Sequence, residues 1–585
     1  MNRVIIGALA ALFTMNAPHA QVPGDRPAPN PRSTRSVVMG RHGMIATSQP
    51  LASAAGLQAL REGGNAVDAA ITAAAVLSVV EPTMNGVGGD LFAIVYDAKT
   101  RKLHVLNSSG RSAYAATPAA FKARNLTAIP SRGVLSVSVP GVVDGWSTLL
   151  ATHGTIPLAK ALAPAIGYAK NGYPVSEIIS HQWQGAERVL AADPAAAATF
   201  LPGGHAPRPG DIFANPRLAA TLETIASGGR DAFYKGPIAA AIVADIRKRD
   251  GLLDARDFAD QKNDWVDPIS TSYRGYDVYE LPPNTQGFAA LEMLNILEGY
   301  DIKSLGHNSA AYLHLLIESK RIAFADRAAY LADPDSVPAP VLKTLISKDY
   351  AAARRKDIDP SRAARDYKPG QIAGVTSSTP ARDLDLMGRD LGDTIYMTVA
   401  DSQGNVVSLI QSLFDDFGAG IVAGDTGIVL HNRGSLFTLE AGHPNQVAPH
   451  KRPLHTLVPA MVMKDGRPWL SFGVMGGDMQ PQGQVQVLCN MLDFGMDVEQ
   501  AGAAPRLEHV GSATPRGEAG SPGGGRVLAE PGIPEAVIKE LLRRGHKIGR
   551  TARNGGGFQG ILIHPKTNVL HGGSEERKDG CAVGY

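Results

Sequence analysis

Cysteine is almost absent from this chain of 585 residues, since only Cys489 and Cys581 occur. Two cysteines without a Cys-X-X-Cys pair cannot build a thiolate zinc site or a disulfide framework. They leave two alternatives, one isolated bridge or two free thiols that pack as small hydrophobic side chains. The chain also lacks a His-Glu-X-X-His pattern, and its 16 histidines show no metal-ligand spacing. We therefore predict no metal site and no cofactor.

Net charge is also nearly absent. Lys and Arg number 57 and Asp and Glu 55, which gives a formal net charge of +2 and no electrostatic reason to expect nucleic acid as a partner. The hydrophobic fraction of 44% excludes a largely disordered chain. Beyond the N-terminus, the most apolar segment is residues 66–80, which contains Asp68 and is too short to span a membrane. These features are typical of a globular enzyme.

The first residues have the pattern of an export signal. Arg3 precedes a short apolar run over residues 4–15, and small residues follow it. The cleavage site is imperfect, so a disordered or anchoring N-terminus is the alternative. We predict a signal peptide over residues 1–20, a Pro-rich leader over residues 21–35 and a periplasmic or secreted protein.

Periodicity and turn residues predict an alternation of helices and strands. Residues 50–80 have the pattern of two Ala-rich helices, with Asn65 as the N-cap of the second. Residues 157–350 are expected to be mostly helical. Strand patterns follow at residues 394–400 and 406–414, with turn residues between them. The pattern favours strands packed between layers of helices.

One short segment suggests chemistry. In Leu391-Gly392-Asp393-Thr394-Ile395-Tyr396, a threonine begins a strand directly after a Gly-containing approach. By itself this signal is weak, because threonine is common in strands. No phosphate-binding loop and no Gly-X-Ser-X-Gly motif offers a different chemistry.

A series of short motifs along the chain gives the segment around Thr394 a functional meaning. The motifs are Pro50-Leu51-Ala52-Ser53, Gly63-Gly64-Asn65-Ala66-Val67-Asp68-Ala69-Ala70, Glu81-Pro82, Gly86-Val87-Gly88-Gly89, Val139-Pro140-Gly141, Ala323-Phe324-Ala325-Asp326-Arg327, Asp333-Pro334-Asp335, Gly418-Ala419-Gly420-Ile421-Val422, Lys451-Arg452-Pro453, Gly476-Gly477, and Asp579-Gly580 to Gly584-Tyr585. Over nearly the whole chain beyond the leader, this series resembles the γ-glutamyltransferase family, also called glutathione hydrolases.

The resemblance implies an α+β fold, the four-layer αββα sandwich of the N-terminal-nucleophile (Ntn) hydrolases. It also implies self-cleavage between Asp393 and Thr394, which would give a large subunit (residues 36–393) and a small subunit (residues 394–585) that stay together as one unit. The chemistry is coherent. A threonine hydroxyl is a weak nucleophile that needs a base. The freed α-amine, with an ordinary pKa near ~8, supplies that base on the same residue.

The resemblance also implies roles for other residues. Gly476 and Gly477 would form the oxyanion hole, since glycine lets backbone N–H groups converge, and a plain turn is the alternative. Ser412 would orient the nucleophile, unless it is an ordinary strand serine. Arg111 would hold a substrate carboxylate with its fork of donors, unless it is a solvated loop arginine.

The donor-recognition positions depart from the family. Counted from Thr394 without gaps, the acid that holds the substrate α-amine falls on Leu436, a nearby asparagine on Phe414, and a serine pair on His455 and Thr456. A leucine cannot neutralise an ammonium group, and burying that group unpaired is unfavourable. We predict that His455 and Thr456 bind substrate, with a packed, hydrogen-bonded core histidine as the alternative for His455.

The sequence thus predicts a self-processing enzyme that transfers a γ-glutamyl or γ-glutamyl-like group through Thr394 to water or an amine acceptor. A glutaryl-amide acylase of the cephalosporin type, which needs no α-amine recognition, is a close alternative. A third hypothesis is an inactive periplasmic binding or scaffold protein on the same fold. The lost donor-site residues favour it, whereas Thr394, Ser412 and the glycine pair argue against it.

Overall fold

The computed structural model describes residues 35–375, 377, 393–521, 523–551 and 556–585. The predicted signal peptide over residues 1–20 lies outside these residues, as does the predicted leader except for its last residue. Leu391 and Gly392, which precede the predicted cleavage site, also lie outside them.

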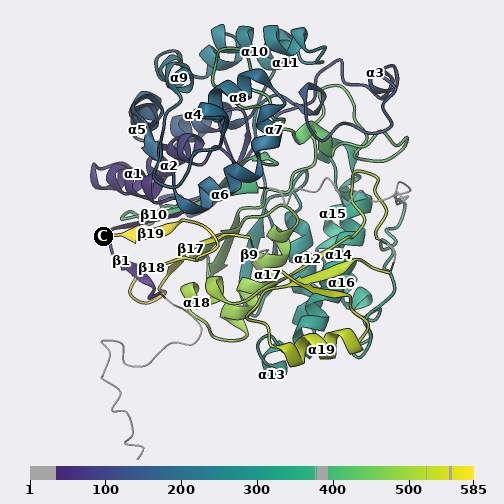
Figure 1. Cartoon of the computed structure of the whole chain (residues 1–585). Coiled ribbons are helices and arrows are strands. Elements are labelled where there is room, and N and C mark those ends of the chain that lie inside the picture. Colours follow the sequence, from purple (N-terminus) through teal and green to yellow (C-terminus); the bar gives the residue numbers. More distant parts are fainter. Residues whose placement is uncertain (1–34, 376, 378–392, 522, 552–555) are drawn as a thin grey trace, which may run out of the picture.

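Two seven-stranded sheets, antiparallel throughout, form the centre of the described chain (Figure 1). The nucleophile sheet, named for the strand that carries Thr394, has the order β19 (Cys581–Gly584), β2 (Gly43–Thr47), β10 (Asp393–Asp401), β11 (Val406–Phe414), β3 (Asp90–Asp97), β4 (Lys102–Ser108) and β7 (Asp264–Val266). The partner sheet has the order β1 (Val38–Gly40), β18 (Leu570–Ser574), β17 (Phe558–Ile563), β13 (Arg467–Val474), β12 (Ala460–Lys464), β9 (Tyr276–Glu280) and β8 (Ile269–Tyr273).

Apolar side chains of the two sheets meet in one cluster. Tyr396 and Ile410 contribute from the nucleophile sheet, and Met461 and Ile561 from the partner sheet. Strands β10 and β11 contact β13 across this cluster. Burial of these side chains therefore holds the strand that carries Thr394 against the partner sheet.

Helices cover the nucleophile sheet in the upper half of Figure 1. They are α1 (Pro50–Arg61), α2 (Ala66–Val80), α4 (Val142–His153), α5 (Leu158–Asn171) and α9 (Pro216–Tyr234). Helix α2 is buried along its whole length and contacts β10 and β11. The predicted cap is confirmed, since Asn65 and Asp68 form a capping box at its start.

The partner sheet carries its own helices in the lower half of Figure 1. Helices α12 (Gly287–Glu298), α17 (Met479–Leu492) and α18 (Val498–Ala503) contact its strands, and α14 (Ala310–Tyr330) and α16 (Lys348–Arg355) pack on α12. The predicted class, a mixed structure of helices and strands, is confirmed.

Smaller elements complete the described fold. They are α3 (Pro118–Lys122), α6 (Glu177–Gly185), α7 (Glu187–Ala191), α8 (Pro194–Phe200), α10 (Pro237–Lys248), α11 (Ala255–Ala259), α13 (Ile302–Leu305), α15 (Ala339–Leu345), α19 (Glu535–Arg543), the 3-10 helices η1 (Val134–Ser136), η2 (Pro202–Gly204), η3 (Pro334–Ser336) and η4 (Arg433–Leu436), and strands β5 (Tyr173–Pro174), β6 (Ile212–Phe213), β14 (Leu507–Val510), β15 (Arg526–Ala529) and β16 (Ile548–Arg550).

The expectation of mostly helical structure over residues 157–350 is wrong between residues 264 and 280, where β7, β8 and β9 form. Burial alternates along β8, which is the period of a strand with one face on a core. Arg274 and Gly275 join β8 to β9 with positive φ angles of 52° and 80°, the geometry of a tight hairpin turn.

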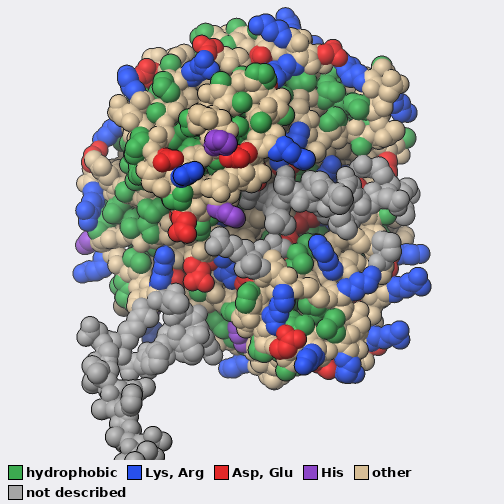
Figure 2. Space-filling view, in the orientation of Figure 1, with side chains coloured by type: hydrophobic (Ala, Val, Ile, Leu, Met, Phe, Trp, Pro, Cys, Tyr) green, Lys and Arg blue, Asp and Glu red, His purple; other side chains and the backbone are tan. Residues whose placement is uncertain are grey.

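Both cysteines are free thiols, Cys489 buried in α17 and Cys581 partly buried in β19. Of the two sequence alternatives, the structure therefore has the unbridged one. Within the described ranges, no group of three or more His, Cys, Asp and Glu side chains is placed to hold a metal ion. The helices found in those ranges are all too short or too polar to cross a bilayer. Figure 2 shows Lys and Arg interspersed with Asp and Glu over the visible face.

Candidate active site

Strands β10 and β11 pair with a change of register where Thr394 lies. Asp393 lies opposite Phe414 and Ile395 opposite Gln411, so a two-residue step along β10 spans three residues of β11. The extra residue makes a β-bulge, which bends a strand and redirects its side chains. Phe414 has a φ of 83°, and its N–H donates to Ser412 Oγ at 2.7 Å. The bulge therefore sets Ser412 and Thr394 at the same point of neighbouring strands.

The Thr394 hydroxyl has a neighbour on helix α17. Thr394 is 1% exposed, and Gln480 Nε2 points at its Oγ1 from 3.5 Å. Gln480 Oε1 accepts a hydrogen bond from Val458 N at 2.9 Å. Because a backbone N–H can only donate, this bond fixes which end of the amide faces Val458 and which faces Thr394. A donor is therefore aimed at the predicted nucleophile.

Gly476 and Gly477 form the turn between β13 and α17. Their φ angles are 101° and 54°, in the left-handed region that favours glycine. The carbonyl of Gly476 accepts from Met479 N at 2.8 Å, which starts the helix. The N–H groups of the two glycines have no acceptor among the described residues. The turn alternative and the oxyanion-hole role are thus compatible, since a turn leaves two donors available.

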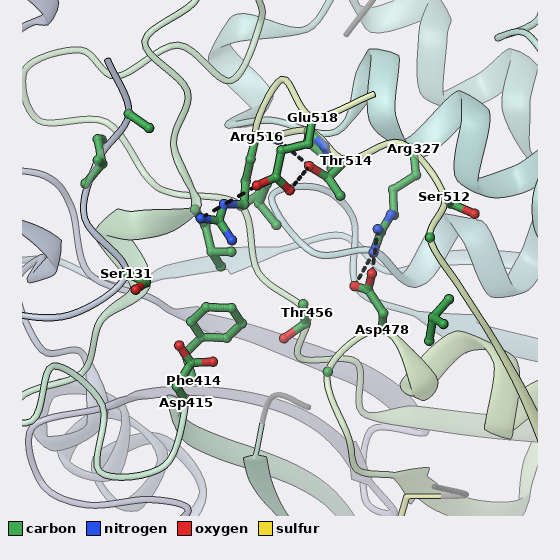
Figure 3. Close-up of a pocket in the computed structure, with 18 of the residues that line it drawn as sticks. Ser131, Arg327, Phe414, Asp415, Thr456, Asp478, Ser512, Thr514, Arg516 and Glu518 are labelled. Carbon is green, nitrogen blue, oxygen red and sulfur yellow. Dashed lines mark hydrogen bonds and ion pairs between the residues drawn. The ribbon is translucent and has the colours of Figure 1, made fainter. Parts of the chain in front are cut away.

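An ion-paired network holds the glycine turn in place. Gln286 Nε2 donates to the carbonyls of Gly477 and Thr456, at 3.0 and 2.9 Å. Arg327 donates to Gln286 Oε1 and makes a two-bond contact with Asp478 at 2.6 and 2.9 Å, as Figure 3 shows. The Arg327 side chain is almost fully buried, whereas Asp478 is 33% exposed, so this charged pair lies at the edge of the cavity. The two hydrogen bonds of Gln286 join the glycine turn to the segment that carries Thr456.

A cavity of about 490 Å³ opens in front of the glycine turn. Gly476, Gly477, Thr456, Phe414 and Leu436 all line this cavity, and Figure 3 shows Thr456 and Phe414 in it. Thr394 is not among the lining residues, and its link to the cavity wall runs through Gln480 on α17, the helix that follows the glycine turn. Of the four donor-recognition positions named in the sequence analysis, those of Phe414, Leu436 and Thr456 thus line one pocket, and that of His455 does not.

Arg111 lies elsewhere. It does not line the cavity, and its guanidinium lies 3.5 Å from Asp264 and 3.8 Å from Asp333. It also donates to the carbonyl of His450 at 3.2 Å. The backbone N–H of Arg452 donates to Asp333 at 2.7 Å, so two of the sequence motifs meet in this ion cluster. Arg111 is therefore neither solvated nor in the pocket, and its contact with a substrate carboxylate stays a prediction.

His455 is a buried residue behind the pocket. Its side chain is fully enclosed, with Nε2 3.2 Å from Asp90 Oδ2 and the ring edge-on to Phe92. Burial, helped by the nearby charge of Arg433, lowers the pKa of His455 to about 3. The ring is therefore neutral at physiological pH. This environment is the packed alternative considered from the sequence, and only Thr456 of the pair lines the cavity.

Two residues beside the predicted machinery received no role from the sequence. Gln480 and Gln286 are buried and bond directly to Thr394 and Gly477. For Gln480 a signal was present, since it follows the glycine pair by three residues at the start of a helix. For Gln286 there was none, because it lies far from the other site residues in sequence.

Comparison with known proteins agrees with this geometry. The family model described as Gamma-glutamyltranspeptidase matches residues 52–585. The glutathione hydrolase-like YwrD proenzyme of Bacillus subtilis (strain 168) is 39% identical over 94% of this chain and 99% of its own. The acylase ACY 1 proenzyme of Pseudomonas sp. (strain SE83) is 36% identical over 95% of this chain and 97% of its own.

Among solved structures, the cephalosporin acylase from Bacillus halodurans superposes with a TM-score of 0.86 at 40% identity, covering 96% of this chain and 99% of that one. The similar proteins are named as hydrolases or acylases, two of them as proenzymes. The chain belongs to the gamma-glutamyltranspeptidase family, which confirms the resemblance found in the sequence.

Replacing Gln480 with leucine tests the donor beside Thr394. Because a donor next to the reacting oxygen stabilises its developing charge, we expect kcat to fall on the order of 10- to 100-fold with little change in KM. Gln484→Leu is the control, since Gln484 lies one turn along the same helix and donates to the carbonyl of Val458. An equal loss in both variants would show that Gln480 acts only through packing.

The buried imidazole of His455 predicts acid sensitivity. Its pKa is about 3 in the folded protein against an ordinary 6.5, so between these values the unfolded chain binds more protons. Stability from this group is thus complete above pH 6.5 and declines as the pH falls toward 3. We expect the melting temperature of His455→Gln to decline less than that of the wild type between pH 6.5 and 4.5. Parallel declines would contradict this assignment.

Proposed function

We propose that this protein is a self-processing amidohydrolase and acyltransferase whose nucleophile is Thr394. The observation that carries the proposal is the placement of Thr394 at the change of register between β10 and β11, beside the Gln480 donor. Gly476 and Gly477, whose N–H groups have no acceptor among the described residues, line a cavity of substrate size. The family and its proenzyme-named members support the same function.

The mechanism begins with cleavage of the chain. The Thr394 hydroxyl attacks the Asp393 carbonyl, and the peptide C–N bond breaks, so that an ester forms on Thr394 and its α-amine becomes free. Water then hydrolyses this ester, which releases the Asp393 carboxylate and restores the Thr394 hydroxyl. In turnover, that amine takes the hydroxyl proton while the oxygen attacks the donor amide. The N–H groups of Gly476 and Gly477 stabilise the tetrahedral oxyanion. The amine then returns the proton to the leaving nitrogen, and water or an amine acceptor releases the acyl group from Thr394.

The subunits and the location of the protein follow from this proposal. The large subunit spans residues 36–393 and the small subunit residues 394–585, and both contribute strands to each sheet. Separation after cleavage would expose the cluster between the sheets, so the subunits stay together. The helices on both sheets fit the αββα sandwich of Ntn hydrolases. With residues 1–20 as a signal peptide, the enzyme is periplasmic or secreted.

The acyl donor most compatible with the pocket lacks an α-amine. Leu436 and Phe414 line the cavity where recognition of an ammonium group would need a carboxylate and an amide. Desolvating an ammonium ion against these side chains is unfavourable. The wall therefore favours glutaryl-type amides, as the acylase names of two similar proteins suggest. A γ-glutamyl donor, as in the glutathione hydrolases, is the second candidate.

Substitution of the nucleophile tests self-processing. Thr394→Ala has no hydroxyl to attack the preceding carbonyl, so we expect one uncut chain without amidase activity. Wild-type protein should give two bands on a denaturing gel, with a new amino terminus at Thr394. Thr394→Ser is the matched control and should still be cut. An uncut wild type without turnover of any anilide would instead support a binding or scaffold protein.

A pair of anilides tests the acyl donor. We expect the wild type to cleave glutaryl-p-nitroanilide with a kcat/KM at least about 10-fold above that of γ-glutamyl-p-nitroanilide, because Leu436 cannot pair with the α-amine of a γ-glutamyl group. Leu436→Asp should narrow this ratio by restoring a carboxylate. A wild type that prefers the γ-glutamyl compound would mean that another acid binds the amine.

A further inference from the structure

Arg433 lies beside the donor-binding wall, on a turn that already contributes to it. The 3-10 helix η4 runs from Arg433 to Leu436. Side chains three residues apart eclipse one another in a 3-10 helix, so Arg433 lies on the same face as Leu436. Leu436 lines the cavity. The 3-10 helix therefore places the positively charged side chain of Arg433 next to the part of the cavity wall that Leu436 forms.

Contacts place the Arg433 guanidinium one side chain behind the cavity surface. Its Nη1 donates to Thr456 Oγ1 at 3.0 Å, and its carbon Cζ lies 4.7 Å from the centre of the Phe414 ring. Both Thr456 and Phe414 line the cavity, as Figure 3 shows. The guanidinium is thus covered by the two residues that a donor's acyl chain would meet.

The rest of the guanidinium is unpartnered. Arg433 is 0% exposed, and neither Nε nor Nη2 has a hydrogen-bond partner among the described residues. Nε and Nη2 form one edge of the guanidinium, with parallel N–H bonds that match the two oxygens of a carboxylate. A buried charge without such bonds is unfavourable unless something binds it.

The neighbouring carboxylates are engaged with other groups. Asp90 Oδ1 accepts from Gly110 N and Gly141 N, at 2.8 and 3.1 Å, while Oδ2 faces His455. Asp415 accepts from Asn432 Nδ2 at 2.7 Å. These acids attract the Arg433 charge without bonding to its open edge. Because neither carboxylate bonds to that edge, it is open to an anion from outside the chain.

We propose that Arg433 binds the terminal carboxylate of the acyl donor, with Thr456 beside it, so that the enzyme cleaves half-amides of dicarboxylic acids. This inference rests on the proposed function of Thr394. A glutamyl α-amine would be placed near a guanidinium and Leu436, which repel or fail to solvate it. The same residue therefore selects for a carboxylate and against an ammonium group. Arg111, the residue predicted from the sequence for a substrate carboxylate, does not line the cavity and lies 3.5 Å from Asp264 and 3.8 Å from Asp333, so it is the rival that the test must exclude.

Two substrates that differ in one group test the proposal. Glutaryl-p-nitroanilide ends in a carboxylate, and 4-carbamoylbutanoyl-p-nitroanilide ends in a neutral carboxamide of the same shape. We expect the wild-type ratio of kcat/KM values to favour the carboxylate on the order of 100-fold. In Arg433→Gln the ratio should fall close to one, while turnover of the carboxamide and cleavage at Thr394 persist.

Matched variants separate a carboxylate site from general electrostatics. Arg526 also lines the cavity but is exposed, so Arg526→Gln removes the same charge and should change the ratio less than about 3-fold. Arg433→Lys keeps the charge without the paired donors and should recover only part of the ratio. Collapse of the ratio in Arg111→Gln, with no change in Arg433→Gln, would overturn the assignment.

Failure of the inference and failure of the proposed function give different results. A processed wild type that cleaves both anilides equally overturns the carboxylate site alone. A wild type that cleaves neither overturns the amidase function as well. If the Arg433 variants are not processed, a crystal structure of wild-type enzyme with glutarate decides. A carboxylate within hydrogen-bond distance of Arg433 Nε and Nη2 supports the proposal, and one bound only at Arg111 or Arg526 contradicts it.

Discussion

The change of register between β10 and β11 is the constraint on which the site depends. An uninterrupted ladder would continue the pairing of Ile395 with Gln411 and give Thr394 a regular partner. Instead, the additional residue of β11 turns Phe414 into a left-handed conformation and sets its N–H on Ser412 Oγ. This irregularity is maintained by rigid surroundings, with α2 on one face of the strands and the cluster between the sheets on the other. A reactive hydroxyl can therefore be held in a fixed position without lying in the open cavity.

The electrostatics of the pocket depend on two residues of the short helix η4, Leu436 and Arg433. Leu436 replaces an acid, and Arg433 on the same short helix brings an enclosed positive charge. Burial lowers the pKa of Arg433 to about 10, which still leaves the side chain charged at neutral pH. Leu436 and Arg433 thus act in one direction. Both make the wall unsuitable for an ammonium group and suitable for an anion.

Much of this structure could be predicted from the sequence, and the exceptions have physical causes. The N-cap at Asn65 and the strands around Thr394 follow local rules, because their signals lie within a few residues. Strand β8 and its hairpin to β9 were missed because a helical expectation was extended over a long region. The positions of Arg111 and His455 depend on Asp264, Asp333 and Asp90, which lie far away in sequence. Such partners cannot be read from local patterns.

The contrast between local signals and contacts of distant residues also explains which site residues could be predicted from the sequence. Family motifs indicate Thr394, Ser412 and the glycine pair, and the structure gathers them around one bulge and one turn. Gln286 and Arg433 acquire meaning only through contacts across elements, since Gln286 joins Gly477 to Thr456 and Arg433 meets Thr456 through space. Arg433 left one clue in the sequence, a cation three residues before the position of the lost acid.

The most direct measurement of the central claim is mass spectrometry of enzyme quenched with acid during turnover of a slowly hydrolysed amide. The account predicts that the acyl mass is carried by the peptide that begins at Thr394, with the α-amine free and the label released by mild base as expected for an ester. A label on any other side chain, or on a peptide that still continues through Asp393, would contradict it.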